Sequence, residues 1–263
     1  MNMYLFELRA YRKNTLMWTL ALTGLALLFM SMFPPIAKEI DEFKKALEGF
    51  PEGVRKALGL QVETIGSVNG YYSYTFMYIA LCGAIQAMTL GISISSKEVR
   101  EKTADFLLTK PVTRTNVLAS KLLAALTCIL FTNIVYLGAA VLIAKAVASG
   151  EFSLTAFLLI SLSLLIISLI MFALGTMLAV LFPKIKSVIS VSLGVVFGFF
   201  VLGMVAGLEE SGRYFSPFKY VDYAYVMKKE TYEWPFLVVG FIIIVLAFIV
   251  SFIVYKKKDI HTV

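Results

Sequence analysis

The sequence predicts an all-α integral membrane protein with six transmembrane helices. Hydrophobic residues make up 59% of the 263 residues and charged residues only 16%, a composition outside the range of soluble globular chains. Six windows also lack charged residues and are long enough to cross a membrane core, which takes about 20 residues. Most of the charge falls in the connections between these windows.

The expected spans lie at about residues 15–34, 72–95, 121–145, 154–181, 188–207 and 235–255. With short connections they form a single transmembrane domain over residues 1–263. Basic residues before the first span resemble a secretory signal, but its apolar run exceeds the roughly 7–15 residues of a signal core. We therefore expect this span to remain in the mature protein.

The first residues are expected to form an interfacial helix. Tyr4, Leu8 and Tyr11 recur at helical spacing, while Glu7 falls largely on another face. Such a pattern is typical of a helix that lies on the membrane surface before the first span.

Two segments on the opposite side of the membrane also have distinct patterns. Residues 36–60 predict two short amphipathic helices broken at Pro51. Residues 214–234 carry eight aromatic residues. They indicate either an aromatic belt at headgroup depth or a surface at which substrate leaves.

The basic residues indicate the orientation. On one side of the membrane there are 14 Lys and Arg residues and five acidic residues, in segments 1–13, 97–121, 183–187 and 256–263. On the other side there are 10 Lys and Arg residues and 12 acidic residues, in segments 38–63, 145–151 and 209–233. Because short basic loops stay in the cytoplasm, we expect both termini to be cytoplasmic. The net charge of +7 then reflects topology, and we expect no nucleic-acid partner.

Ionisable residues are absent between the ends of the spans, apart from Lys145 at an outer helix end. Ion-coupled carriers usually keep such a group in the membrane. The single histidine, His261, lies in the C-terminal tail, and no HExxH motif is present. The pattern therefore disfavours an ion-coupled carrier and an intramembrane hydrolase, and we expect no metal site or catalytic residue.

Uncharged polar residues remain within the spans. One stripe of the second span contains Tyr78, Cys82, Gln86, Thr89 and Ser93. Packing and hydrogen bonding between helices is the simpler interpretation. The alternative is a substrate path, for which the candidates are Gln86, Asn133 and Tyr136.

Small residues form two patches on the fifth span. Gly194 and Gly198 lie on one face, and Gly203 lies opposite Gly194, with Gly207 beyond it. Glycine lets helix backbones approach closely. We expect one patch to pack within the subunit and the other to contact a second copy.

The densest charge lies in residues 96–121, SKEVREKTADFLLTKPVTRTNVLASK, around the apolar group FLL. A simple connection between spans needs few polar residues and no such apolar group. We expect a short cytoplasmic helix ended by Pro111, followed by a helix capped by Thr113 or Thr115. The segment predicts a docking surface for another protein, or alternatively an amphipathic helix on lipid headgroups.

This loop resembles the cytoplasmic loop of ABC-2 type transporter permeases. The pattern E-x-x-x-G-T-x-x-x-L-L-x-x-P-V-x-R, followed by a Lys, is matched except where Lys102 replaces Gly. Four further segments resemble other regions of these permeases. The opening FELRAYRKNTLMW is similar to their N-terminal interfacial helix, and LEGFPEGVRKALG is similar to their first outer loop. FSPFKYVD resembles the segment before their sixth span, and YKKKDI resembles their basic tail. The matching and neighbouring residues of the loop are Glu98, Glu101, Thr103, Phe106, Leu107, Leu108, Pro111, Val112, Arg114 and Lys121.

The resemblance implies that the loop is a coupling helix that docks on a separate ABC ATPase subunit, which binds ATP and Mg. It also implies two permeases, either two copies or a copy and a paralogue, in contact with membrane lipid in the plasma membrane of a prokaryote. The chain has no G-x-x-x-x-G-K-[ST] phosphate loop and no Gly-Lys dipeptide. Because that lysine binds the phosphates, we expect no ATPase activity and no cofactor on this chain.

These observations favour the permease subunit of an ATP-driven exporter. The spans offer aliphatic and aromatic surface, 11 Met and few polar groups, which suits a hydrophobic or amphipathic substrate such as a peptide, drug or lipid. The alternatives are a non-transporting sensor or assembly component of an ABC complex, and a passive channel.

Overall fold

The computed structural model describes residues 3–57, 62–100, 113–148, 152–182, 185–206, 209 and 211–257. Within these residues the regular structure is entirely helical, and six helices are long and apolar enough to cross a membrane. The predicted fold class is thus confirmed. The six are α1 (Met3–Ser31), α5 (Val68–Arg100), α7 (Arg114–Val147), α8 (Leu154–Leu181), α9 (Val188–Ala206) and α11 (Trp234–Lys257).

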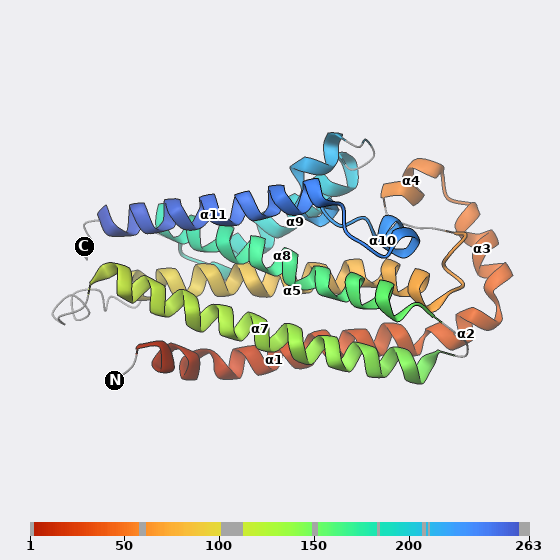
Figure 1. Cartoon of the computed structure of the whole chain (residues 1–263), viewed down its shortest axis with the longest axis horizontal. Helices are drawn as coiled ribbons and strands as arrows, with labels where there is room; N and C mark the ends of the chain where they lie inside the picture. Colours follow the sequence, from red (N-terminus) through yellow and green to blue (C-terminus); the bar gives the residue numbers. More distant parts are fainter. Residues whose placement is uncertain are drawn as a thin grey trace.

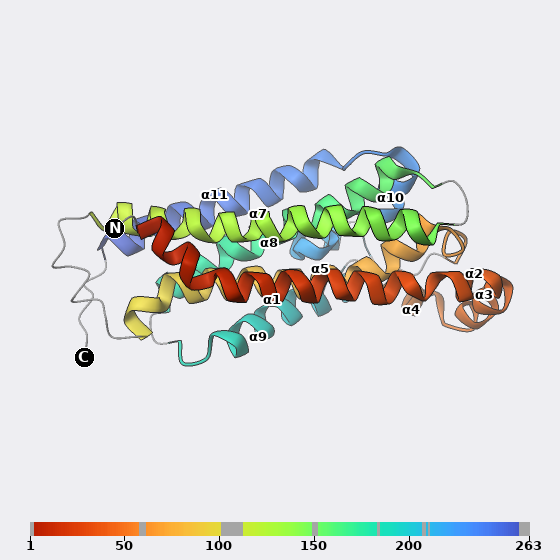
Figure 2. The same ribbon diagram turned by 90° about the horizontal axis from the view of Figure 1, so that it is seen from below.

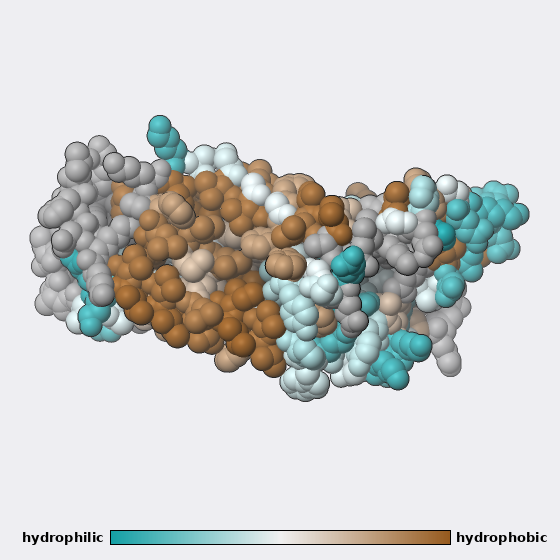
Figure 3. Space-filling model, turned by 90° about the horizontal axis from the view of Figure 1, so that it is seen from above, coloured by the Kyte–Doolittle hydropathy of each residue, from teal (hydrophilic) through white to brown (hydrophobic). Residues whose placement is uncertain are grey.

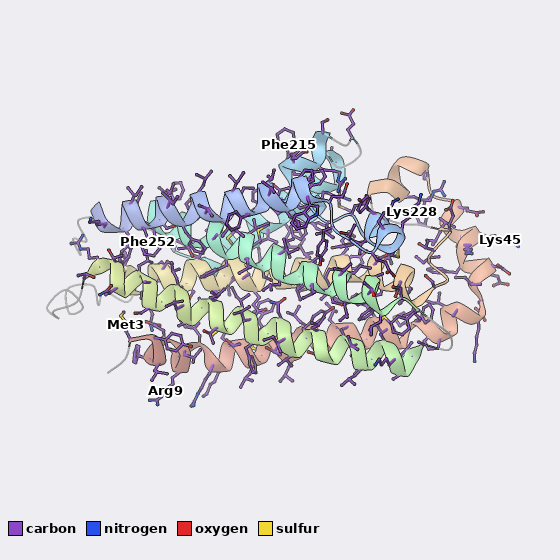
Figure 4. All side chains as sticks on the ribbon, in the orientation of Figure 1. Met3, Arg9, Lys45, Phe215, Lys228 and Phe252 are labelled. Carbon is purple, nitrogen blue, oxygen red and sulfur yellow. The ribbon has the colours of Figure 1, made fainter. Side chains whose placement is uncertain are left out.

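The six long helices run side by side and alternate in direction (Figure 1). The starts of α1 and α7 and the ends of α5 and α11 therefore share one end of the bundle, here called the termini end. Met3 and Arg9 mark it in Figure 4. The opposite end, called the loop end, carries Lys45 and Lys228.

Helices α5 and α8 form the centre of the bundle. In their most apolar stretches 61% of residues are buried, against 17–28% in the other four long helices. The outer helices therefore present their apolar side chains outward. Figure 3 shows the resulting broad apolar surface on the face that carries α9 and α11, with polar residues beyond it at the loop end.

Glycines bring α5 and α8 into close contact. A Cβ atom built on Gly91 would lie 2.5 Å from the carbonyl oxygen of Phe172, and one on Gly175 would lie 2.7 Å from that of Met88. Real side chains do not reach such distances, so only glycine fits there. These two glycines thus allow the backbones of α5 and α8 to lie in contact.

Short helices cover the loop end. The connection after α1 forms α2 (Phe33–Lys38), α3 (Ile40–Glu48) and α4 (Glu52–Ala57). Pro51 separates α3 from α4, as predicted, because proline has no amide proton to continue the helix. Before α11 the chain forms η1 (Ser211–Phe215), η2 (Pro217–Lys219) and α10 (Tyr223–Lys229).

The N-terminal residues do not form a helix separate from the first span, so this part of the expectation is wrong, and their position at the membrane surface stays a prediction. These residues form the first turns of α1, which bends near its start (Figure 2). The Tyr4 hydroxyl lies 3.1 Å from Thr127 Oγ1 on α7, and the Tyr11 hydroxyl lies 2.9 Å from Ser93 Oγ on α5. The apolar stripe therefore packs on neighbouring helices, because two partners are available there that the sequence pattern does not reveal.

Candidate functional site

The last turns of α5 are tied to α1 by a buried ion pair. Lys97 Nζ lies 2.9 Å from Glu7 Oε2, and the Glu7 side chain is only 2% exposed. The lysine also lies 4.9 Å from the centre of the Phe6 ring, a cation–π distance. From the sequence, Glu7 falls on a different face from the apolar stripe of the first residues. In the structure Glu7 is nevertheless buried, because Lys97 of α5 lies against it.

A second tie joins the same part of α5 to α7. Lys121 is completely buried, and its Nζ donates a hydrogen bond to the carbonyl oxygen of Ile94 at 2.8 Å. Ile94 lies one helical turn before Lys97. Helices α1 and α7 thus both hold the turn of α5 that precedes residues 101–112. We call Glu7, Lys97 and Lys121 the anchor residues.

Most of the predicted coupling residues lie outside the described residues: Glu101, Thr103, Phe106, Leu107, Leu108, Pro111 and Val112. Glu98 falls in the last turn of α5, and Arg114 is the first residue of α7. The predicted cap is confirmed, because the Thr113 side chain accepts a hydrogen bond from the Asn116 amide at 3.3 Å. The two described ends of the loop are therefore the last turn of α5 and the capped first turn of α7.

The candidate path residues make hydrogen bonds between or within helices. Gln86 Nε2 donates to Thr132 Oγ1 at 3.0 Å, and that hydroxyl lies 3.0 Å from Thr19 Oγ1. One polar cluster therefore links α5, α7 and α1. Asn133 Nδ2 donates to the Ile129 carbonyl of its own helix.

Tyr136 belongs to a second buried cluster. Its hydroxyl lies 2.7 Å from that of Tyr72, which also lies 2.8 Å from Ser161 Oγ. This cluster joins α5, α7 and α8. In this conformation Gln86 and Tyr136 therefore join neighbouring helices, whereas Asn133 bonds within its own helix.

Another part of the α5 polar stripe is more accessible. Tyr78, Cys82 and Thr89 are half-buried. Helices α1 and α9 both pack on α5 and border the same face of the bundle (Figure 2). This face, which we call the α1–α5–α9 face, carries uncharged polar groups on its central helix.

The two glycine patches of α9 have different surroundings. No atom lies within 4 Å of a Cβ built on Gly194 or Gly198, whereas one built on Gly203 would lie 2.7 Å from Ser216 Oγ. The Gly203 side thus packs within the chain, and the other side is open. Gly207 lies outside the described residues.

Residues 211–236 form an ordered aromatic segment at the loop end. Arg213 pairs with Glu233 through both of its terminal nitrogens. Burial lowers the pKa of Lys219, an effect that nearby Asp222 opposes and Arg213 reinforces. Burial raises the pKa of Tyr232 to about 12, so this hydroxyl stays protonated and can donate a hydrogen bond at neutral pH.

Comparison with known proteins decides the family. Residues 4–256 match the family described as multidrug efflux system permease Rv1217c, C-terminal domain. The chain belongs to this permease family. It is a multi-pass membrane permease of an efflux system. No curated protein and no solved structure matches the permease.

Proposed function

We propose that the permease is the membrane subunit of an ABC exporter of the ABC-2 type, driven by a separate ATPase that binds ATP and Mg. The anchor residues carry this proposal. A loop that receives force from an ATPase has to pass it to the spans, and Glu7 and Lys121 attach the base of this loop to two further helices. The loop motif around Phe106 and Leu107 supports the same partner.

The proposed substrate is a hydrophobic or amphipathic compound, in keeping with the multidrug description of the family. The termini end then faces the cytoplasm, because it carries the larger share of Lys and Arg. The loop end, with its aromatic segment, faces the outside. In this orientation the end of α5 and the start of α7 lie on the cytoplasmic side, where the ATPase is expected to bind.

We further propose that two permeases, identical or paralogous, pair through their α1–α5–α9 faces. The open patch at Gly194 and Gly198 allows close approach of a second backbone. The half-buried side chains of Tyr78 and Cys82 then line the space between the subunits, where a substrate passes. Gln86 becomes accessible only when α5 separates from α7, and Tyr136 likewise requires helix movement, whereas Asn133 is half-buried already.

The ATPase partnership is tested by replacing Phe106 and Leu107 with aspartate. Burial of two such side chains contributes roughly 3–6 kcal/mol, so we expect binding of the ATPase to weaken by more than about 100-fold. Co-purification and substrate-stimulated ATP hydrolysis measure the loss. The matched control is Phe182→Asp, an exposed residue at the same end. Full co-purification of the double variant would refute docking at this loop.

The paired arrangement is tested by cross-linking in a C82A/C128A background. Cysteines at Gly194 or Gly198 on α9, combined with one at Leu20 or Gly24 on α1, are expected to form covalent dimers with a short bifunctional maleimide. Gly138→Cys on α7 is the control, because its surroundings are equally open. Dimers formed through Gly138, with none through α9, would place the interface elsewhere.

A further inference from the structure

A cavity of about 740 Å³ opens at the loop end beside the start of α11. Its volume lies within the range of small-molecule sites, about 300–1,000 Å³. Side chains from η1, α10, the connection after α10 and the start of α11 line it: Ser211, Tyr214, Tyr225, Tyr232, Glu233, Trp234, Pro235 and Phe236. Five of these eight residues are aromatic, so ring surfaces form much of the wall.

Contacts with the rest of the chain fix several of these rings. The Tyr232 hydroxyl donates to the carbonyl oxygen of Leu159 on α8 at 2.6 Å. The Tyr214 and Phe236 rings lie with their centres 4.7 Å apart. These rings are already ordered without a ligand, so binding costs little further side-chain entropy.

Among the described residues that line the cavity, Glu233 is the charged one. Arg213 lies outside the lining and binds Glu233 through both terminal nitrogens, so much of the carboxylate charge is compensated. The Arg213 Cζ atom is 4.0 Å from the centre of the Phe236 ring, which shows that a ring of this wall already holds a cation against it. The remaining ring faces, among them those of Tyr225 and Trp234, supply the main attraction for a further cation.

We propose that this cavity binds a lipophilic onium cation, meaning a quaternary ammonium or phosphonium centre with apolar substituents. Its mouth lies at the boundary of the apolar span, because the 73% exposed Trp234 is both a lining residue and the first residue of α11. Lipophilic cations gather at this depth of a membrane. The assignment of such a cation as export substrate rests on the proposed function, whereas its binding here does not.

Tetraphenylphosphonium and tetraphenylborate test the proposal, because they share size and shape but carry opposite charges. The chain has two tryptophans, so the W18F variant leaves Trp234 as its fluorescent reporter. In neutral detergent, without ATPase or ATP, we expect saturable change of Trp234 emission with the phosphonium and at least tenfold weaker binding of the borate. Equal affinity for both ions would overturn the cation site.

Variants locate the site by equilibrium dialysis of radiolabelled tetraphenylphosphonium. Tyr225→Ala and Trp234→Ala are expected to weaken binding at least tenfold. Phe215→Ala is the control, because Phe215 is 66% exposed, lies in the same segment (Figure 4) and is absent from the lining. Unchanged binding in both cavity variants would overturn the proposal even if the wild-type protein binds the cation.

A third arm distinguishes the source of the cation. Dihexanoyl-phosphatidylcholine below its micelle concentration is added as competitor. Displacement of the phosphonium identifies a choline headgroup as an occupant of the cation site, whereas a lack of displacement assigns the site to free lipophilic cations. Every arm measures binding alone. A protein that does not bind the cation would therefore contradict this site without contradicting ATP-driven export. Conversely, a permease that does not couple to an ATPase can still bind the cation.

Discussion

Replacing Gly91 with alanine is expected to destabilise the permease by on the order of 3 kcal/mol, the upper part of the range for overpacked cores. The added Cβ would lie 2.5 Å from the carbonyl oxygen of Phe172 and 3.0 Å from the amide nitrogen of Thr176. Both are backbone atoms, so no side-chain rotation relieves the contact. Helices α5 and α8, the centre of the bundle, have to move apart.

Thermal unfolding followed by size-exclusion chromatography measures this effect. A loss of about 3 kcal/mol corresponds to a fall in melting temperature of roughly 6–12 °C. Gly138→Ala is the matched control in α7, because a Cβ atom there meets nothing within 4 Å. This variant is expected to melt at or slightly above the wild-type temperature, since alanine favours helix. A wild-type melting temperature for G91A would contradict the close packing of α5 on α8.

Replacing Glu7 with glutamine is expected to separate the termini-end segment of α5 from α1. Removing one partner of a buried ion pair costs roughly 3–5 kcal/mol, because the remaining charge loses its compensation. Lys97 is only 15% exposed, so water replaces little of the lost interaction. We expect a lower melting temperature and, in the proposed complex, ATP hydrolysis that substrate no longer stimulates.

The double variant E7K/K97E distinguishes the pair from a general effect of substitution. It restores opposite charges at the two positions, so stability is expected to recover in part relative to E7K alone. Arg9→Gln is the control on the same helix, because Arg9 is exposed. If E7K/K97E unfolds as readily as E7K, the contact between these side chains is not what stabilises this end. If substrate still stimulates ATP hydrolysis in E7Q, the ion pair between Glu7 and Lys97 is not required for coupling.

The sequence by itself determined the features that depend on one segment of chain. The six spans follow from hydropathy because a helix long enough to cross a membrane is recognisable from its own residues. The break at Pro51 and the cap at Thr113 also follow from local chemistry, a missing amide proton and a side-chain acceptor. The predicted coupling residues at 101–112 lie outside the described residues, so the docking surface stays a prediction.

Only the tertiary structure decided what each side chain faces. Gly91 and Gly194 are both glycines within apolar helices, yet one touches a neighbouring backbone and the other is open. Likewise, nothing near Glu7 in the sequence indicates Lys97, which lies 90 residues away and meets it because α1 packs against the end of α5. Helical periodicity defines the faces of each helix. Which face is buried against which partner depends on how all the helices pack together.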